Sequence, residues 1–395
     1  MANALSFTQV SQILASVMDQ AQGREGTIAP INETQFVAMA QTTLKTGNDN
    51  MLNAISQVLS KTIFSVRPYN RKLKGMYMDN IRFGNHVRKI SPIDGTYEDD
   101  PSYSLTDGQA VDPWTVRKPK VIQMNWYGEN AYMTELTIFR HQLNNAVRSS
   151  AEFGEFVTMV MQNVSDRNEQ KHEGIARMTL ANLIVAKSVA DPDNVIHLIS
   201  EYKSQVGITD PTFDYRAPEN YPDFARWLFG FLETLSDRLT ERGIQYHMNV
   251  TDKEICRHTP KDMQIMYLYA PIMNDIKTRV QSVTFNEDDL GIGSYERLTY
   301  WQNPNDPQAV DVIPVYIDSN GAQVDGTEAV KVENIFGVIF DRDCCGYTIR
   351  ENPWVSTTPM NPKGSYYNVY WHFLDVPFMD LSENSIILLL DEDPS

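Results

Sequence analysis

The end of the chain reads FDRDCCGYTIR at residues 340–350, SYYNVYWHF at 365–373 and NSIILLLD at 384–391. These stretches are rich in aromatic and β-branched residues, a composition that favours strands. A chain end is normally the least ordered part of a domain, yet these stretches have the composition of a core. Because they contain no recognisable catalytic constellation, they indicate a role in structure and assembly.

The composition indicates a well-packed protein. At 395 residues, with 42% hydrophobic and 10% aromatic residues, the chain can hold roughly two to three ordinary domains. Its first residues lack the pattern of a signal peptide. No uncharged apolar run approaches the roughly 18 residues of a membrane span, so we expect no membrane partner. Three cysteines, two of them adjacent, favour synthesis in a reducing cytoplasm over a disulfide framework.

The charge is acidic overall and uneven. A net charge of -17 repels phosphate backbones and argues against sequence-specific DNA binding. Such acidity either aids solubility or lets a surface lie near nucleic acid without binding it. Residues 67–120, by contrast, hold ten Lys or Arg and seven Asp or Glu. This basic segment fits either complementarity between subunits or an ordinary solvated hairpin.

The first sixty residues predict short helices that form an arm. Ser6 and Gln9 make a capping box. Three apolar stripes at helical spacing follow. They are Val10, Ile13, Leu14 and Val17; Phe36, Val37, Ala40 and Leu44; and Met51, Leu52, Ile55, Val58 and Leu59.

Residues 62–136 predict one long hairpin. Tyr77–Lys89 and Val121–Tyr132 alternate enough to be strands, and the polar stretch Pro92–Pro113 separates them. Because a hairpin of this length cannot bury both faces in its own domain, we expect it to reach a neighbour.

The longest predicted helix follows. Ser149 and Glu152 form a capping box, and an apolar stripe runs on to about Ala186. About 36 helical residues would span ~54 Å, with Gly174 as a weak point. The stripe begins with Phe153, Phe156, Val157, Val160, Met161 and Val164.

Residues 190–340 predict a compact α/β unit. An amphipathic helix runs from Phe224 to Leu239, and Thr259–Pro260 is expected to begin another. Val310–Tyr316 and the strand after the turn at 318–321 predict a hairpin. Val338–Phe340 predicts a buried strand.

Tests for catalytic and metal-binding motifs give weak matches. His172 and Glu173 are half of a helical zinc motif, but Ala176 stands where the second His is needed. We therefore expect His172 to be a polar helix residue. Cys256 and His258 form a lone ligand pair, and the acidic run at 287–289 beside Gly291 and Gly293 is most simply a solvated loop.

Two further groups of residues have plain structural explanations. Cys344 and Cys345 are expected to be a small buried pair, and residues 391–393 a solvated end. With no nucleophile elbow and no phosphate loop in the sequence, we predict no catalytic, cofactor-binding or metal residues, no cofactor and no enzymatic role.

The order of these elements resembles the major capsid protein of tailed bacteriophages, with the Hong Kong ninety-seven-type fold. Local sequence carries the same resemblance over most of the chain, least in 190–335. The similar stretches are AQTTLKTG (40–47), LNAISQVL (52–59), IFSVRPY (63–69), FDRD (340–343), TPMNPKGSYYN (358–368) and WHF (371–373).

The resemblance implies an α+β fold with a long E-loop hairpin and a long spine helix. The corresponding parts would be an N-terminal arm at 1–61, the E-loop hairpin at 62–136, a P-domain with the spine helix at 137–189, an A-domain at 190–344 and P-domain return strands at 345–395.

The resemblance also implies a shell-forming subunit of a virion, synthesised in the host bacterial cytoplasm. Copies would form hexamers and pentamers of an icosahedral head that encloses double-stranded DNA without reading its sequence. Scaffolding, portal and decoration proteins are candidate partners. The alternatives are an encapsulin-like compartment shell, which shares the fold, and an acidic cytoplasmic enzyme.

The implied contacts between subunits come from the hairpin and the long helix. The candidate interface residues are Arg67, Arg71, Arg82, Arg88, Lys89, Arg117, Lys118, Val157 and Met161.

Overall fold

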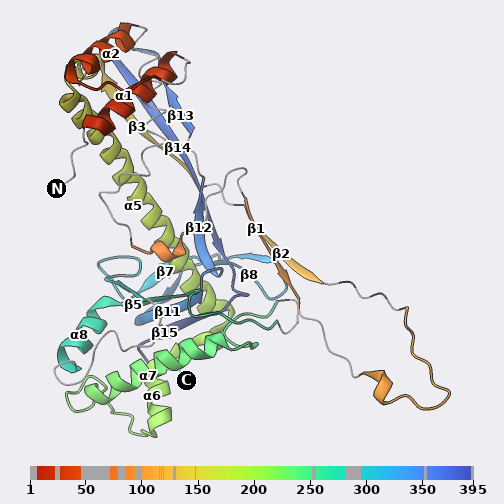
Figure 1. Ribbon diagram of the computed structural model, residues 1–395. Helices are drawn as coiled ribbons and strands as arrows, with labels where there is room; N and C mark the ends of the chain where they lie inside the picture. Colours follow the sequence, from red (N-terminus) through yellow and green to blue (C-terminus); the bar gives the residue numbers. More distant parts are fainter. Residues whose placement is uncertain are drawn as a thin grey trace. The chain divides into compact units, whose positions relative to one another are not determined.

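The computed structural model (Figure 1) divides the chain into two compact units. The first unit comprises Met1–Asn85, Gly128–Ala176 and Tyr347–Val376, and the second comprises His86–Tyr127, Arg177–Gly346 and Pro377–Ser395. The structure describes residues 7–22, 27–45, 72–78, 86–93, 100–114, 116, 118, 120–127, 130–146, 148–250, 255–280, 295–350 and 354–392.

The first unit packs helices on one face of an antiparallel sheet. Strand β14 pairs with β3 over Tyr366–Asp375 and with β13 over Val369–His372, and β12 is also a neighbour of β14. Its elements are α1 (Phe7–Gln22), α2 (Glu33–Lys45), η2 (Lys74–Met76), β3 (Asn130–Phe139), α4 (Arg140–Ala146), the start of α5 (Ser150–Ala190), β12 (Cys345–Ile349), β13 (Trp354–Thr357) and β14 (Tyr366–Met379).

The apolar stripes of the arm helices form part of this core. Val10, Leu14 and Val17 of α1 and Phe36 of α2 are buried with Phe153 of α5. Along β14, alternate side chains enter the same core, as the period of two in a strand requires. The first two predicted arm helices are therefore confirmed, whereas the third stripe, Met51–Leu59, lies outside the described residues.

Helix α5 is continuous over 41 residues. The backbone N–H of Glu152 donates to Ser149 Oγ at 3.2 Å, which confirms the predicted start. The helix runs four residues past the predicted end at Ala186. A side chain at Gly174 would meet nothing within 4 Å, so this glycine neither breaks the helix nor serves a close contact.

The second unit is built on a five-stranded sheet of order β4-β15-β11-β5-β6. Strand β11 is antiparallel to both neighbours, while the outer pairs β15–β4 and β5–β6 are parallel. The sheet strands are β4 (Val195–His197), β5 (Gln264–Tyr269), β6 (Tyr295–Leu298), β11 (Ile335–Asp341) and β15 (Ser385–Leu389).

Helices of the second unit cover the sheet and supply its core. Phe224, Leu228 and Leu232 of α7 are buried with Ile339 of β11 and Leu388 of β15. This confirms the predicted amphipathic helix and the buried strand at 338–340. The helices are η4 (Pro192–Asn194), α6 (Leu198–Val206), α7 (Tyr221–Thr240) and α8 (Ala270–Val280).

Three small antiparallel pairs complete the second unit. Strand β1 (His86–Pro92) pairs with β2 (Val121–Tyr127) on either side of a long connection that contains η3 (Pro101–Tyr103). Strands β8 (Val315–Ile317) and β9 (Gln323–Asp325) form a hairpin around the predicted turn. The predicted first strand Val310–Tyr316 is however two strands, because β7 (Val310–Val312) pairs with β10 (Val330–Val332).

The structure corrects two further predictions about strands and helices. Thr259–Pro260 begins a turn, in which Met263 N donates to Pro260 O at 2.9 Å, and β5 follows in place of a helix. The predicted strand Val121–Tyr132 is two strands, because β3 pairs with β14 and only β2 pairs with β1. At the start of the other predicted strand, Tyr77 forms an isolated parallel bridge with Tyr347, and residues 79–85 lie outside the described residues.

The terminal strands do not return to one layer. Strand β14 pairs with β3 and β13, whereas β15 lies in the five-stranded sheet between β4 and β11. Strand β15 therefore belongs to the sheet of the second unit and not to the sheet of β14. No helix among the described residues has the length and apolarity of a membrane span.

Candidate functional site

The β1–β2 hairpin has two unlike faces. Residues that are directly opposite share a face, and faces alternate along each strand. Val87, Lys89 and Ser91 of β1 therefore lie on one face with Met124 and Trp126 of β2. This inner face is buried or half-buried.

The outer face of the hairpin is exposed and carries large apolar side chains among polar ones. Ile90 of β1 and Val121 and Tyr127 of β2 are all more than half exposed. The ring of Tyr127 stacks on His86 with 5.6 Å between ring centroids. Large exposed side chains at these positions are typical of a protein–protein contact.

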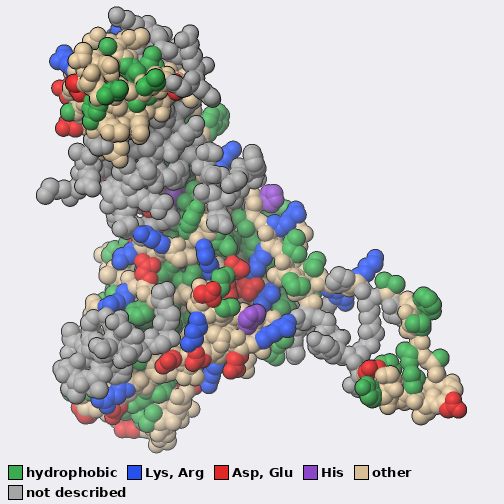
Figure 2. All heavy atoms as spheres, in the orientation of Figure 1, with side chains coloured by type: hydrophobic (Ala, Val, Ile, Leu, Met, Phe, Trp, Pro, Cys, Tyr) green, Lys and Arg blue, Asp and Glu red, His purple; other side chains and the backbone are tan. Residues whose placement is uncertain are grey.

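The connection between β1 and β2 carries more exposed apolar side chains. Tyr103 is 92% exposed, Trp114 is 85% exposed and Val116 is 80% exposed. Figure 2 shows hydrophobic side chains gathered around the part of this connection that holds η3. Tryptophan and tyrosine are the residues that most often dominate binding energy in interfaces. We call residues 100–116 the hairpin tip.

Lys89 fixes the inner face of the hairpin to its own unit. Its Nζ atom lies 2.7 Å from Asp380 Oδ2 and 2.7 Å from Glu383 Oε1, and it donates to the carbonyl oxygen of Asp343 at 3.3 Å. Burial alone would lower the pKa of Lys89, but the two carboxylates outweigh burial and raise it above its ordinary value. Lys89 is thus a charged anchor within the chain.

Trp126 supplies a second anchor from β2. Its indole Nε1 donates to the carbonyl oxygen of Met379 at 3.0 Å, and its ring lies 5.9 Å from the ring of Phe378. Both anchors meet residues 378–383, which are the last two residues of β14 and the turn that follows it. We call this segment the hairpin seat.

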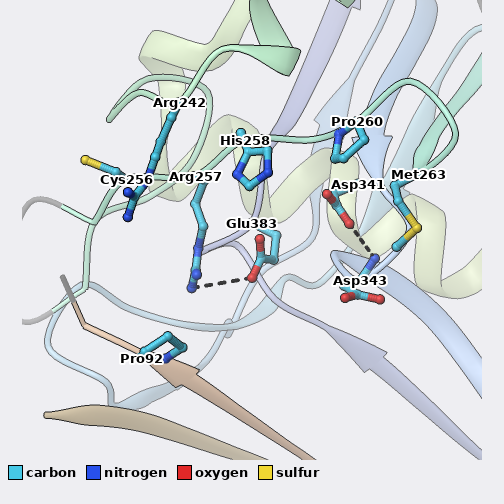
Figure 3. A pocket seen from close by; sticks show the side chains of 10 residues that line it. All are labelled: Pro92, Arg242, Cys256, Arg257, His258, Pro260, Met263, Asp341, Asp343 and Glu383. Carbon is cyan, nitrogen blue, oxygen red and sulfur yellow. Dashed lines mark hydrogen bonds and ion pairs between the residues drawn. The ribbon is translucent and has the colours of Figure 1, made fainter. Parts of the chain in front are cut away.

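A pocket of about 410 Å³ adjoins the seat (Figure 3), lined by residues that include Pro92 of β1 and Glu383. Asp341 Oδ2 accepts from Thr259 Oγ1 at 2.7 Å, and Arg257 lies 3.4 Å from Glu383 Oε1. Burial raises the pKa of Glu383, while Lys89 and Arg257 oppose that rise. The pocket's acidic groups therefore pair mainly with groups of the same unit.

The weak catalytic and metal motifs have structural explanations. His172 lies in helix α5 as predicted. It is buried there, and its Nε2 lies 3.6 Å from Oδ1 of the buried Asp375. Cys344 and Cys345 are buried as predicted, and burial raises the pKa of Cys344 to about 12, so its thiol stays protonated. Within the described ranges, no three His, Cys, Asp or Glu residues are grouped to hold a metal ion.

The acidic end of the chain is anchored, contrary to expectation. Asp391 Oδ1 lies 2.7 Å from His197 Nδ1, and Lys203 Nζ donates to Glu392 Oε1 at 2.6 Å. The acidic run at 287–289 and both nearby glycines lie outside the described residues.

The structure describes part of the predicted interface set. Arg88 lies on the exposed outer face of β1 and Lys118 is exposed in the connection, while Lys89 faces the seat. Outside the described residues lie Arg67, Arg71, Arg82 and Arg117, and the side chains of Val157 and Met161.

The sequence analysis missed an exposed aromatic face on the first unit. Trp354 of β13 is 70% exposed and its ring lies 5.4 Å from His372, which is paired with Met133 of β3. Phe139 and Tyr366 meet edge to face on the same side of the sheet. The alternation along β14 was the signal, since the residues between its buried positions must face outward.

Comparison with known proteins identifies the family. The model of the Phi29-like phage major capsid protein family matches residues 16–389. The chain belongs to this family. A search of curated proteins gave no match.

One solved phage capsid structure supports this fold. The capsid structure of Staphylococcus phage Andhra has 10% identity to this Phi29-like capsid protein and a TM-score of 0.50, covering 84% of this chain and 86% of that chain. A chain from the structure of the head fiber and inner core protein gp22 of native bacteriophage P68 has 9% identity and a TM-score of 0.49, covering 81% and 85%.

The predicted fold class is therefore confirmed: the chain has the Hong Kong ninety-seven-type phage capsid fold, with mixed helix and sheet. Family membership gives the Phi29-like protein a structural role in the phage capsid. The exposed hairpin face, the hairpin tip and the aromatic sheet face are its candidate contact surfaces.

Proposed function

We propose that this protein is the head subunit of a tailed double-stranded DNA phage, and that its copies assemble as hexamers and pentamers of an icosahedral shell. The observation that carries the proposal is the hairpin, which is seated on its own unit by one face and exposes large apolar side chains on its second face and tip. Family membership in the phage major capsid proteins supports the same role.

The exposed surfaces suit head-to-tail contacts between copies. Such heterologous contacts close into rings, which is how capsomers form. The hairpin and the aromatic sheet face are different surfaces, so one copy's hairpin can contact another copy without competing for the same patch. The domains proposed from the sequence, N-arm, E-loop, P-domain and A-domain, would take these roles in each copy.

The charge distribution of the chain supports both the proposed contact between copies and the proposed enclosure of DNA. Arg88 and Lys118 are exposed on the hairpin of a chain with net charge -17, so a neighbour's acidic body attracts them. The same overall acidity keeps the inner surface from binding packaged DNA tightly. Scaffolding, portal and decoration proteins are further proposed partners, and synthesis takes place in the host cytoplasm.

The test combines assembly with charge reversal. Purified chain is examined by sedimentation and electron microscopy, next to an Arg88→Glu/Lys118→Glu variant. We expect shells from the wild-type chain, and weaker assembly of the variant with a smaller dependence on salt. Equal assembly at every salt concentration would refute the electrostatic contact.

A second measurement tests the contents of the shell. Particles purified from infected cells should protect double-stranded DNA from nuclease. Particles that instead hold a packaged enzyme and no DNA would favour a compartment shell and refute the viral function.

A further inference from the structure

The hairpin needs support at its base if its exposed face is to have a fixed direction. A two-stranded sheet is marginally stable by itself. Here seven residues of β1 pair with seven of β2, and all other described residues of the hairpin are in the connection. Any order in the pair must therefore come largely from what the inner face contacts.

Hydrogen bonds hold the residues of the seat that contact the inner face. Asp380 Oδ1 accepts from both the backbone N–H and the hydroxyl of Ser382, at 2.9 and 2.6 Å, which leaves Oδ2 for Lys89. Arg257 donates through Nε to the Ser382 carbonyl oxygen at 3.1 Å. These hydrogen bonds thus hold the acceptors of the seat in place without needing Lys89.

The two anchors, Lys89 and Trp126, lie on different strands at nearly the same position along the hairpin. Lys89 is paired with Met124, two residues from Trp126 along β2. One anchor is ionic and the other combines a hydrogen bond with ring packing. Together they resist both sliding of the hairpin and rotation about its long axis.

We propose that Lys89 and Trp126 are positioning residues for capsid assembly: seated on residues 378–383, they fix the direction in which the outer face and tip meet a neighbouring copy. Neither residue needs to touch that neighbour. Prior ordering of a binding surface lowers the entropy lost on association, so the seat acts on assembly affinity. This inference rests on the proposed function.

The test uses Lys89→Met and Trp126→Phe, with Arg88→Met as the matched control on the opposite face of β1 and Lys89→Arg as the rescue variant. Amide hydrogen exchange is measured on unassembled chain, and the critical concentration for assembly is measured by sedimentation. We expect the two anchor variants to exchange β1–β2 amides about tenfold faster or more. We expect their critical concentrations to rise about tenfold or more.

If Lys89 and Trp126 only stabilised the unit as a whole, their loss would accelerate exchange in β11 as much as in the hairpin. The positioning role predicts a different pattern. Exchange of the β11 amides should stay as in the wild type, because the five-stranded sheet does not depend on the hairpin. Lys89→Arg should restore most of the assembly. Arg88→Met should leave hairpin exchange unchanged, even though the loss of this outer charge is expected to weaken assembly. Unchanged hairpin exchange and assembly in both anchor variants would overturn the proposal, as would equal acceleration of β11 and the hairpin.

Failure of the proposed function is distinguishable. If wild-type chain forms no shells under any condition, the capsid function and this inference both fail. If wild-type chain assembles and the anchor variants assemble equally well, only the positioning role fails.

Discussion

Truncating Trp114 to alanine should impair assembly without affecting the fold. The side chain is 85% exposed in the single chain, so its loss should change the free energy of unfolding by no more than about 0.5 kcal/mol. Its backbone N–H donates to Asp112 Oδ1 at 2.9 Å, a hydrogen bond that alanine retains.

The magnitude follows from the exposed area. A tryptophan side chain can bury about 200 Å², which at about 25 cal/mol per Å² is worth up to about 5 kcal/mol. Ordering the side chain takes back about 1 kcal/mol, and tip residues rarely bury their full area. We therefore expect Trp114→Ala to cost about 2–4 kcal/mol per contact, equivalent to about 30-fold to about 900-fold in the association constant.

The assay is the critical concentration for assembly, measured by light scattering and checked by sedimentation. Val206→Ala is the matched control, because Val206 is also an exposed apolar residue, 54% exposed, but lies at the end of α6. An unchanged critical concentration for Trp114→Ala, or an equal rise for the control, would refute the assignment of the tip to an interface.

Two further predictions concern stability of the second unit and the long helix. A methyl group at Gly337 would lie 2.7 Å from Leu268 Cδ2, so Gly337→Ala should lower the free energy of unfolding in urea by about 1–3 kcal/mol. Gly174 has open space around it, so Gly174→Ala should raise the free energy of unfolding by up to about 1 kcal/mol. The reverse order of stabilities would contradict the packing. Burial lowers the pKa of Lys187, so its ammonium group loses its proton at a lower pH in the folded state than in the unfolded state. The contribution of Lys187 to the free energy of unfolding therefore rises as the pH approaches the ordinary lysine pKa of 10.5. Lys187→Met should flatten that rise on the acid side of the ordinary lysine pKa, and an unchanged slope would show that this lysine does not cause it.

Local patterns in the sequence were enough for α1, α2, α5 and α7, but they also predicted a helix at Thr259–Pro260, where a turn and β5 stand. The stripes Val10–Val17 and Phe153–Val164, with their caps, are properties of adjacent residues, and periodicity reports them directly. The family resemblance supplied the fold, because the order of elements carries information that no single element does.

Strand pairing was where local patterns failed. The stretch 121–132 looks continuous, yet β3 leaves the hairpin to pair with β14, more than two hundred residues later in the chain. Likewise β15 joins the five-stranded sheet and not the strands that precede it. Such choices depend on non-local contacts, which composition does not encode.

The candidate interface residues show the same difference between what local patterns and what non-local contacts determine. Basic composition marked both Arg88 and Lys89, although adjacent residues in a strand must face opposite ways. Only the seat decides that Lys89 faces inward, since Asp380 and Glu383 are far from it in sequence. Tyr103 and Trp114 of the tip were passed over because they lie in or beside the polar stretch Pro92–Pro113.

The central claim is that this chain builds a shell through its hairpin, and electron cryomicroscopy of the assembled wild-type protein tests it most directly. The account predicts closed shells in which the outer face of β1–β2 and the tip lie against an adjacent subunit while Lys89 stays on residues 378–383 of its own chain. A particle of 45.1 kDa that remains a monomer at every concentration, or shells in which the hairpin touches no neighbour, would contradict it.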